Sequence, residues 1–460
     1  MSKYFGTDGF RGKAGVGLNA DHAFRIGRFL GWYYRQVNGH RPQIVIGKDT
    51  RRSSYMFEYA IASGITASGA DAYMLHVTTT PSVSYVTNKD DFDCGVMISA
   101  SHNPYYDNGI KLVNSHGEKM EQSVLDKIEL YLDGEYEALG ISSAGLPYAS
   151  DDEIGQIVDY SAGRNRYIAY LISLAKNSYK GMRIGLDCAN GSSWMLAPSV
   201  FEALGAKTYT IGTTPNGTNI NNGVGSTHIE ALSSFVKENH LDAGFAFDGD
   251  ADRCLAVDEN GDILSGDHIL YIFANELKRQ GSLVNNTVVT TVLSNLGLYR
   301  ALEAADIRYV QTAVGDKYVY ENMLETGNCV GGEQVGHIIL SKYATTGDGI
   351  LVAIMLMETM KNRKTTLSKL AAPVVLFPQV MRNVAVASKE AVNANPAVNA
   401  KIEEVQKRLG KTGRVLVRPS GTEPLIRIMI EAGNVEKCEA LAEEIVSVIR
   451  DEGLAASSVH

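Results

Sequence analysis

Apolar and polar residues along the chain follow a strand–helix–strand pattern that occurs three times. In each repeat the first strand candidate is apolar and ends in small polar residues: IVIGKDT (44–50), RIGLDCANG (183–191) and VVTTVLSN (288–295). A helix-like stretch follows each of them, over Tyr59–Ser68, Pro198–Leu204 and Leu296–Ala304. The second strand candidates align on Tyr73, Tyr209 and Tyr309: GADAYML (69–75), GAKTYTI (205–211) and ADIRYVQ (305–311). The pattern predicts three βαβ units, and hence three related α/β domains with mixed, mostly parallel sheets.

The last part of the chain has a different pattern and predicts a smaller α+β domain. Its candidate elements are a strand (Val384–Ala387), a helix (Ala400–Leu409), two strands (Arg414–Arg418 and Leu425–Glu431) and a final helix (Val435–Ile449). Asn434 stands where the N-cap of the final helix is expected. We therefore expect four domains, over residues 1–153, 154–253, 254–370 and 371–460.

The composition indicates a globular enzyme rather than a nucleic-acid-binding or membrane protein. The 460 residues are 45% hydrophobic and carry a formal net charge of −9, and no long basic run occurs. No apolar segment approaches the length of a membrane span, and the first residues lack the apolar core of a signal peptide. The five cysteines are scattered without a CxxC pair, as in a reduced protein. We expect a cytoplasmic enzyme with a small-molecule substrate and neither a nucleic-acid nor a membrane partner; both a monomer and a homodimer are compatible with the sequence.

The segment 247–262, FDGDADRCLAVDENGD, holds the most informative polar cluster. Asp248, Asp250 and Asp252 alternate, so their carboxylates can converge on one hard cation. The same spacing matches an EF-hand calcium loop, but Arg253 stands where that loop requires glycine. The apolar runs on both sides also predict strands, whereas an EF-hand needs two helices. We therefore favour a Mg²⁺ site, with positions left open for water or a phosphate oxygen, over both an EF-hand and a solvated polar turn.

Two glycine-containing loops carry residue types that bind phosphate. RPSGTEP (418–424) lies between two strand candidates and offers hydroxyls, backbone N–H groups and nearby guanidinium groups. Its candidate residues are Arg418, Ser420, Gly421, Thr422 and Arg427. The alternative for this loop is an ordinary hairpin connection. FGTDGFRG (5–12) places two glycines around Arg11 and is the weaker signal, since glycine-rich termini are often only flexible.

Ser101 lies in ISASHNP (98–104), directly after an apolar strand candidate. A nucleophilic serine normally needs a base from elsewhere in the chain, whereas the side chain of the adjacent His102 is expected to point away from it. Ser101 is therefore either an ordinary loop serine or a serine activated without a Ser-His-Asp arrangement.

Taken together, ISASHNP, DGDADR and RPSGTEP closely resemble motifs of the α-D-phosphohexomutases, in the same order and over the full length of the chain. The resemblance implies three α/β domains and a C-terminal domain around one central active-site cleft. In order, the four domains would carry the phosphoserine loop, the metal-binding loop, the sugar-binding loop and the phosphate-binding loop. The resemblance also implies a reversible shift of phosphate between O6 and O1 of a hexose through a phosphoserine enzyme and a 1,6-bisphosphate.

Further strings resemble the branch of this family that acts on an amino sugar: YFGTDGFRG, MISASHNPYYDNGIKL, NINNGVGSTH, VGDKYV, GGEQVGH and TTGDG. This branch implies a hexosamine phosphate as the substrate, converted from glucosamine 6-phosphate to glucosamine 1-phosphate. It also implies Mg²⁺ as cofactor, glucosamine or glucose 1,6-bisphosphate as activator, and a place in UDP-N-acetylglucosamine and cell-wall precursor synthesis.

The resemblance implies roles for individual residues. Catalytic roles fall to Ser101 as the phosphoryl carrier and to Arg11, Lys111 and His337 near the reacting oxygen. The implied metal ligands are phosphorylated Ser101, Asp248, Asp250 and Asp252. The implied substrate-binding residues are Arg253, Asp316, Lys317, Glu333, Gln334, Arg418, Ser420, Gly421, Thr422 and Arg427. The general base stays open between Lys111 and His337, because an ordinary lysine pKa of about 10.4 is too high for the task. His102 is expected to shape the turn rather than to move protons.

The sequence departs from the family pattern at three positions. Val335 follows GGEQ where serine is usual, which would remove one side-chain hydrogen bond to the sugar, worth about 0.5–1.5 kcal/mol. Lys317 replaces a commoner arginine, which keeps the charge and loses the forked donor geometry. Val224 replaces a frequent cysteine, and we attach no mechanism to that change. Val335 bears on the sugar preference and leaves phosphoryl transfer intact.

Three other functions remain as alternatives. A phosphomannomutase or phosphoglucomutase would use the same mechanism on a different sugar. A non-catalytic sugar-phosphate-binding homologue would be expected to lack Ser101 or one of the aspartates, and all of them are present. A phosphatase would result if water reached the phosphoserine.

Overall fold

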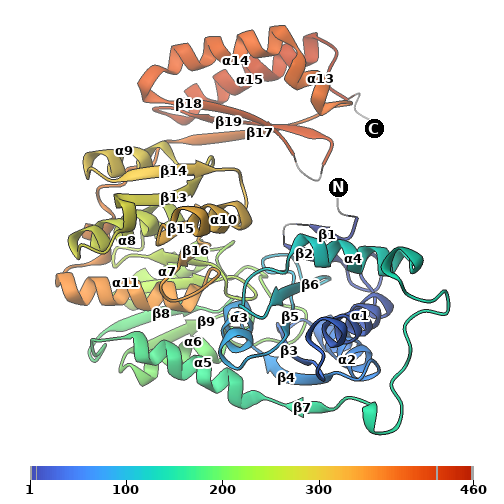
Figure 1. The fold of residues 1–460 in the computed structure, drawn as a ribbon. Helices are drawn as coiled ribbons and strands as arrows, with labels where there is room; N and C mark the ends of the chain where they lie inside the picture. Colours follow the sequence, from blue (N-terminus) through green and yellow to red (C-terminus); the bar gives the residue numbers. More distant parts are fainter. Residues whose placement is uncertain (1–2, 7, 421–422, 457–460) are drawn as a thin grey trace. The chain divides into compact units, whose positions relative to one another are not determined.

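The protein, described here from a computed structural model, has two compact units. The structure describes residues 3–6, 8–420 and 423–456. Unit 1 comprises residues 1–293 and 307–372, and unit 2 comprises residues 294–306 and 373–460. Among the described residues, unit 1 contains three sheets and unit 2 contains one (Figure 1).

The first sheet has seven strands in the order β1-β2-β6-β5-β3-β4-β7. The strands are β1 (Phe5–Gly6), β2 (Gly9–Lys13), β3 (Gln43–Lys48), β4 (Asp71–Val77), β5 (Cys94–Ile98), β6 (Asp107–Asn114) and β7 (Ile157–Asp159). The helices of this part are α1 (Ala20–Asn38), α2 (Arg52–Thr66), α3 (Thr80–Lys89) and α4 (Gln122–Asp133). Ile44 and Ile46 of β3 share a core with residues of α1 and α2, whereas Val45 packs with Val83 of α3. The sheet is therefore covered on both faces, which explains its nearly continuous apolar strands (Figure 1).

The second and third sheets of unit 1 are smaller and also mixed, with strand orders β12-β11-β10-β8-β9 and β14-β13-β15-β16. The second sheet consists of β8 (Arg183–Asp187), β9 (Lys207–Ile211), β10 (Ala243–Phe247), β11 (Cys254–Val257) and β12 (Ile263–Leu264). The third consists of β13 (Thr287–Thr291), β14 (Arg308–Thr312), β15 (Val330–Gly332) and β16 (Ile338–Leu340). The helices that accompany them in unit 1 are α5 (Ser161–Leu174), α6 (Leu196–Ala203), α7 (Glu230–Asn239), α8 (Gly266–Arg279), α10 (Asp316–Thr326), α11 (Gly349–Arg363) and α12 (Leu367–Ala371).

The three predicted βαβ units are confirmed. They are β3-α2-β4, β8-α6-β9 and β13-α9-β14, where α9 is Leu296–Ala304, and in each the two strands are parallel neighbours. Helix α2 begins at Arg52, earlier than the predicted Tyr59, because its first turn is polar and carries no apolar period. The predicted boundary after Arg253 falls between β10 and β11, which are paired strands of one sheet. We therefore propose to place that boundary after Leu264, the last residue of the sheet.

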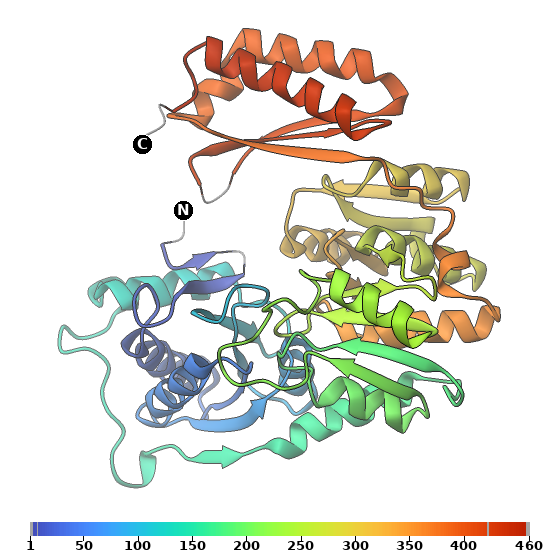
Figure 2. The same cartoon turned by 180° about the vertical axis from the view of Figure 1, so that it is seen from behind.

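Unit 2 contains the predicted small α+β fold. Its antiparallel sheet has the order β17-β19-β18, with β17 (Gln379–Ala385), β18 (Arg414–Pro419) and β19 (Leu425–Glu431). The helices that follow α9 in this unit are α13 (Lys389–Ala394), α14 (Pro396–Leu409) and α15 (Val435–Asp451), and α14 and α15 lie on one face of the sheet (Figure 2). The N-cap prediction is confirmed, because the Asn434 side chain accepts a hydrogen bond from the Lys437 N–H group at 2.8 Å.

None of the helices in the described ranges is long and apolar enough to cross a membrane.

Candidate active site

Three aspartates gather on the hairpin between β10 and β11. One carboxylate oxygen from each of Asp248, Asp250 and Asp252 lies within 4.8 Å of the others, and all three residues are buried. Among the described residues, no group hydrogen-bonds to Asp250 Oδ1 or Asp252 Oδ1, although both atoms are inaccessible to solvent. Buried acceptors without donors are rare, and a divalent cation with oxygen ligands would satisfy them. The cluster therefore fits a metal site, and the strands on both sides exclude the EF-hand alternative.

Positive charge compensates this cluster only in part. Lys111 on β6 donates to Asp250 Oδ2 at 2.5 Å and to Asp252 Oδ2 at 3.1 Å. Burial alone would lower the pKa of Lys111, but these two carboxylates outweigh burial and raise it above its ordinary value. Burial would raise the pKa of Asp252, but Lys111 and His337 outweigh burial and hold it well below its ordinary value. Burial and the neighbouring carboxylates, in contrast, raise the pKa of Asp248. A lysine alone thus leaves part of the negative charge unmatched.

Ser101 is buried and lies against the aspartate cluster. Its Oγ donates to Asp248 Oδ2 at 2.5 Å, and its N–H group donates to Ser99 Oγ at 2.9 Å. The backbone of Ser101 has a φ of 51°, in the left-handed region that residues other than glycine rarely adopt. A second contact between the first two sheets is the hydrogen bond from Thr80 Oγ1 to Asp250 Oδ2 at 2.5 Å. The fold therefore brings a serine of the first sheet into direct contact with the aspartates of the second.

Two side chains hold the Ser101 loop by its carbonyl groups. Arg51, which is fully buried, donates to Ser101 O at 3.1 Å and to Asn103 O at 2.6 Å. Asn221 donates to the same two carbonyl oxygens at 2.9 Å and 3.1 Å. Gly249 allows the aspartate loop to come this close, because a Cβ there would lie 2.4 Å from Ser101 O. The Ser101 loop is thus held by one side-chain donor from the first domain, Arg51, and one from the second, Asn221.

The expectation that His102 points away from Ser101 is wrong. His102 Nδ1 lies 3.2 Å from Ser101 Oγ and 3.2 Å from Arg253 Nη1. Because the left-handed backbone at Ser101 turns the chain sharply, consecutive side chains come to lie side by side. Burial, together with the positive charges of Arg253 and Arg11, lowers the pKa of His102 to about 4. His102 is therefore neutral near pH 7 and can accept a hydrogen bond from Arg253.

A hairpin of the third sheet carries Glu333 and His337, whose backbones are joined by the Glu333 N–H···His337 O hydrogen bond of 3.0 Å. His337 Nε2 accepts a hydrogen bond from the Gly347 N–H group at 3.1 Å, and its Nδ1 lies 3.7 Å from Asp252 Oδ1. Burial opposes the charged form of His337, but Asp316 and Asp252 outweigh burial and raise its pKa. Burial raises the pKa of Glu333, whose Oε1 accepts from the Gly315 N–H group at 3.1 Å.

The remaining candidates of unit 1 differ in how well they are held. Arg253 is half-buried, and Asp248 and Asp252 outweigh the effect of burial and raise its pKa. Asp316 forms an ion pair with Lys119, whose Nζ donates to Asp316 Oδ1 at 2.6 Å. Arg11 on β2 lies 3.5 Å from a carboxylate oxygen of Asp8. Lys317 and Gln334 are less embedded: Lys317 Nζ is 3.9 Å from the exposed Glu321, and Gln334 is half-buried.

The second phosphate candidate, in unit 2, pairs two arginines. Arg418 and Arg427 stand opposite each other in the β18–β19 register. Burial and the charge of Arg427 lower the pKa of Arg418. Arg427 Nη2 donates to Glu423 Oε2 at 3.0 Å and to Ser420 Oγ at 3.5 Å. Two predicted loop residues lie outside the described part of the chain: Gly421 and Thr422. Two facing guanidinium groups favour an anion at this hairpin.

Comparison with known proteins agrees with this geometry. Four family models match nearly the whole chain: phosphoglucomutase/phosphomannomutase alpha/beta/alpha domain I over residues 2–138, domain II over 165–261, domain III over 265–376, and the C-terminal domain over 381–448. The chain belongs to the phosphoglucomutase/phosphomannomutase family. Within the family it is 60% identical over 456 residues to a phosphoglucosamine mutase of Lachnospira eligens, with 99% of this chain and 100% of that protein covered. It is 49% identical over 452 residues to the phosphoglucosamine mutase of Bacillus subtilis, covering 98% of this chain and 99% of that protein.

Solved structures share the family fold at lower identity. A family protein from Burkholderia thailandensis has a TM-score of 0.81 and 22% identity, with 99% of both chains covered. The N-acetylphosphoglucosamine mutase of Aspergillus fumigatus, in complex with GlcNAc-6P and magnesium, has a TM-score of 0.72 and 19% identity, with 98% of this chain and 96% of that chain covered. A serine-to-alanine variant of that mutase, in complex with glucose 1,6-bisphosphate, has a TM-score of 0.67 and 18% identity over 99% of this chain and 96% of that chain.

Proposed function

We propose that this protein is a phosphoglucosamine mutase, which interconverts glucosamine 6-phosphate and glucosamine 1-phosphate. The observation that carries the proposal is the direct hydrogen bond between the buried Ser101 hydroxyl and Asp248, a member of the three-carboxylate cluster. A serine held against a candidate cation site is what a phosphoserine donor requires. The relatives that match nearly the full length of the chain at 60% and 49% identity are phosphoglucosamine mutases, which supports the amino-sugar substrate.

In the proposed cycle Ser101 carries the phosphoryl group. A sugar hydroxyl oxygen attacks the phosphorus of phospho-Ser101, the bond from phosphorus to Oγ breaks, and the sugar becomes a 1,6-bisphosphate. The bisphosphate then turns end for end, and its other phosphate is transferred back to Ser101. Mg²⁺ held by Asp248, Asp250, Asp252 and a phosphate oxygen would offset the negative charge and make the phosphorus a better electrophile.

Two residues near the aspartate cluster are candidates for proton transfer at the reacting oxygens, Lys111 and His337. In the arrangement described here Lys111 is charged, because Asp250 and Asp252 outweigh its burial, so it suits the role of a proton donor to a leaving oxygen. His337 receives the Gly347 N–H group at Nε2, which assigns the ring proton of the neutral form to Nδ1, beside Asp252. We assign Lys111 and His337 to proton transfer as a pair, with Arg11 and Arg253 stabilising the charge of the transferred phosphate.

The other loops are proposed to bind the substrate. Glu333 would accept hydrogen bonds from the sugar's hydroxyl or amino groups, since the Gly315 N–H group fixes one of its oxygens. Arg418 and Arg427, with Ser420, would hold the phosphate that is not reacting. Asp316, Lys317 and Gln334 remain proposed sugar-side contacts. The activator would be glucosamine or glucose 1,6-bisphosphate. We also propose that the enzyme is cytoplasmic, acts as a monomer or a homodimer, and binds a free hexosamine phosphate.

The experiment that tests the proposal measures kcat/KM on glucosamine, glucose and mannose 6-phosphates under one set of conditions. The assay contains Mg²⁺ and a trace of 1,6-bisphosphate, and the Ser101→Ala protein serves as the negative control. A strong preference for glucosamine 6-phosphate supports the proposal. Equal or higher kcat/KM on glucose or mannose 6-phosphate would leave the proposed mechanism in place and show that the substrate is a different sugar. Release of inorganic phosphate alone would indicate a phosphatase.

Val335→Ser should raise kcat/KM for glucosamine 6-phosphate by about 2–10-fold, because a hydroxyl adds one hydrogen bond of about 0.5–1.5 kcal/mol. Val335 is 38% exposed and lies in the Glu333–His337 hairpin, so the smaller side chain disturbs no core packing. The measurement is kcat/KM of the two proteins, with Val335→Thr as a matched variant that keeps the branched shape and adds the hydroxyl. If neither hydroxyl changes kcat/KM, position 335 does not contact the sugar.

Asn221→Ala should lower kcat about tenfold, or about 1.4 kcal/mol, with KM unchanged. The variant removes one of the two donors to the Ser101 and Asn103 carbonyl groups, so the loop no longer holds the phosphoryl group in one position. The control is Asn222→Ala, which removes the exposed side chain of the next residue. A fall in thermal stability with kcat unchanged would show that Asn221 has only a structural role.

A further inference from the structure

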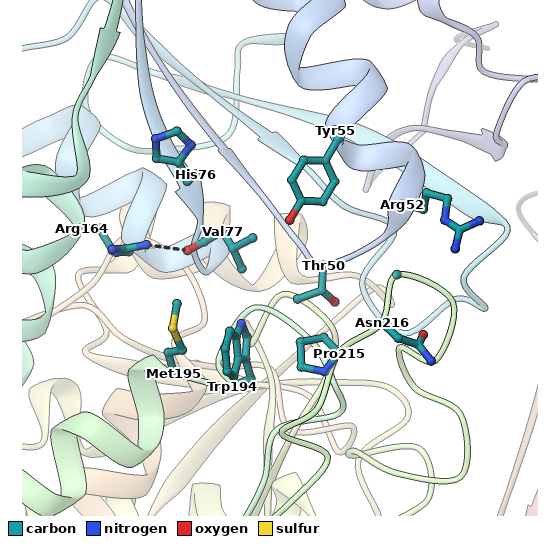
Figure 3. A pocket seen from close by; sticks show the side chains of 11 residues that line it. Thr50, Arg52, Tyr55, His76, Val77, Arg164, Trp194, Met195, Pro215 and Asn216 are labelled. Carbon is teal, nitrogen blue, oxygen red and sulfur yellow. Dashed lines mark hydrogen bonds between the residues drawn. The ribbon is translucent and has the colours of Figure 1, made fainter.

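A pocket distinct from the aspartate cluster opens between the first two domains of unit 1 (Figure 3). Its volume is about 510 Å³, which lies in the range of small-molecule sites. The first domain contributes Thr50, just after β3, and Val77, the last residue of β4. The second domain contributes Arg164 of α5 and Trp194, which lies between β8 and α6. The pocket thus adjoins the carboxyl ends of parallel strands, where α/β proteins commonly bind ligands.

The charge of the pocket favours an anion. Arg52, His76 and Arg164 are among its eleven lining residues, and none of the eleven is acidic. Within the described part of the chain, the Arg52 guanidinium makes no hydrogen bond or ion pair, and Arg164 makes one long hydrogen bond, to Val77 O at 3.4 Å. His76 faces the carboxylate of Asp159 at 3.6 Å, and that aspartate is exposed. In a chain of net charge −9, two arginines without a carboxylate partner leave positive charge available to a ligand.

The pocket also offers two aromatic surfaces. Figure 3 shows the Tyr55 ring and the Trp194 indole projecting from opposite walls, with Thr50 between them and Pro215 beside the indole. Tyr55 is 46% exposed, although its ring is large and apolar. Flat aromatic groups bind between such side chains, and in nucleic-acid complexes every base can stack on them, because every base has a π-face.

We propose that this pocket binds a nucleoside phosphate, with its base against Trp194 and Tyr55 and its phosphate at Arg164, on the side of the pocket that also carries His76 (Figure 3). The aromatic rings account for the base, and the Arg164 guanidinium, which has no carboxylate partner among the described residues, accounts for the phosphate. A hexose phosphate could use the same guanidinium group but offers no flat aromatic group to the two rings.

The bound nucleotide changes the turnover of Ser101, because both walls of the pocket lead to the Ser101 loop. The walls are joined by the Arg52 N–H···Gly217 O hydrogen bond of 2.9 Å. On one wall, Arg51, the neighbour of Arg52, donates to Ser101 O at 3.1 Å. On the other, Asn221 follows Gly217 closely in sequence and donates to the same oxygen at 2.9 Å. A ligand that moves either wall therefore moves a donor that fixes the phosphoryl-carrying serine.

The binding test uses Trp194 as its reporter and does not depend on the proposed mutase activity. The chain has two tryptophans, so Trp32→Phe leaves Trp194 as the single tryptophan, which is excited selectively at wavelengths that tyrosine does not absorb. This protein is titrated with UMP and AMP, and separately with uridine, adenosine and inorganic phosphate. We expect at least one nucleotide to change the fluorescence and to bind at least tenfold more tightly than its nucleoside or phosphate alone. Arg164→Ala should weaken that binding by more than about fivefold, whereas Lys89→Ala, which removes an exposed charge outside the pocket, should not.

Three results would overturn the proposal. Absence of binding by either nucleotide at millimolar concentration, measured also by calorimetry on the unsubstituted protein, excludes the site. Binding of inorganic phosphate as tight as that of the nucleotides shows a plain anion site and removes the role of the aromatic rings. Nucleotide binding that leaves kcat unchanged disproves the link to Ser101; a change in kcat that Arg164→Ala abolishes supports it.

Discussion

Ser101→Ala should lower mutase turnover by more than about 10³-fold while the protein stays folded, because the variant removes the atom that carries the phosphoryl group. The hydroxyl is buried against Asp248, so alanine leaves a small gap and frees a carboxylate from one hydrogen bond. Substrate binding through the other loops is unaffected, so the loss falls on kcat. The measurements are kcat and KM with glucosamine 6-phosphate, and the unfolding midpoint of both proteins.

The matched control for this prediction is Ser115→Ala, at an exposed serine in the turn that follows β6. The unsubstituted protein and Ser115→Ala should both accept phosphate from a 1,6-bisphosphate, and mass spectrometry should place it on the peptide that contains Ser101. Ser101→Ala should carry none. Turnover of Ser101→Ala within tenfold of the unsubstituted protein would contradict the phosphoserine cycle, as would phosphate at another residue of an active protein.

The elements that the sequence predicted well are those with a clear apolar period. The three βαβ units and the strands beside the aspartates follow from runs of apolar residues that a two-faced sheet requires, and the structure confirms them. The start of α2 was missed because Arg52, Ser53 and Ser54 carry no apolar signal, although Ser54 is buried against Asp49. The periodic spacing of apolar residues therefore predicts which face of a helix or strand packs against the core. It does not predict the start of a helix whose first residues are polar and hydrogen-bond to a neighbouring loop.

In the candidate site, too, the features that depend on residue type were predicted from the sequence, and those that depend on backbone geometry were not. The alternating aspartates predicted a metal site, and the structure gathers their carboxylates as expected. The position of His102 beside Ser101 and the grip of Arg51 and Asn221 on the loop carbonyls were not predicted. The left-handed backbone at Ser101 leaves no signal in the pattern of apolar and polar residues, and neither do hydrogen bonds to carbonyl groups far along the chain. The roles of the individual residues in catalysis stay predictions that rest on the resemblance and on this geometry.

Asp250→Asn should reduce the affinity for Mg²⁺ by more than about 100-fold and abolish mutase activity at micromolar metal. A Mg²⁺ site that keeps positions open for water or phosphate has few protein ligands, so each one contributes strongly to the affinity. Even the loss of a group that only supports a metal ligand typically lowers metal affinity by about 10–100-fold. Asp250 Oδ1 is a buried acceptor with no hydrogen-bond donor among the described residues, so the amide that replaces it supplies a neutral ligand at best. Calorimetric titration with Mg²⁺ measures the affinity directly. A chelator should stop turnover of the unsubstituted protein, and added Mg²⁺ should restore it.

Thermal unfolding supplies a readout of this site that does not depend on activity. A ligand that binds only the folded state at 100 times its dissociation constant stabilises it by about 2.7 kcal/mol. Mg²⁺ should therefore raise the unfolding midpoint of the unsubstituted protein and leave that of Asp250→Asn unchanged. Asp262→Asn is the control, because Asp262 is an exposed aspartate directly before β12 and outside the cluster, so its response to Mg²⁺ should match that of the unsubstituted protein. An unchanged Mg²⁺ affinity in Asp250→Asn would show that the buried carboxylates hold no metal, and Lys111 and Arg253 would then be the counter-ions of the cluster.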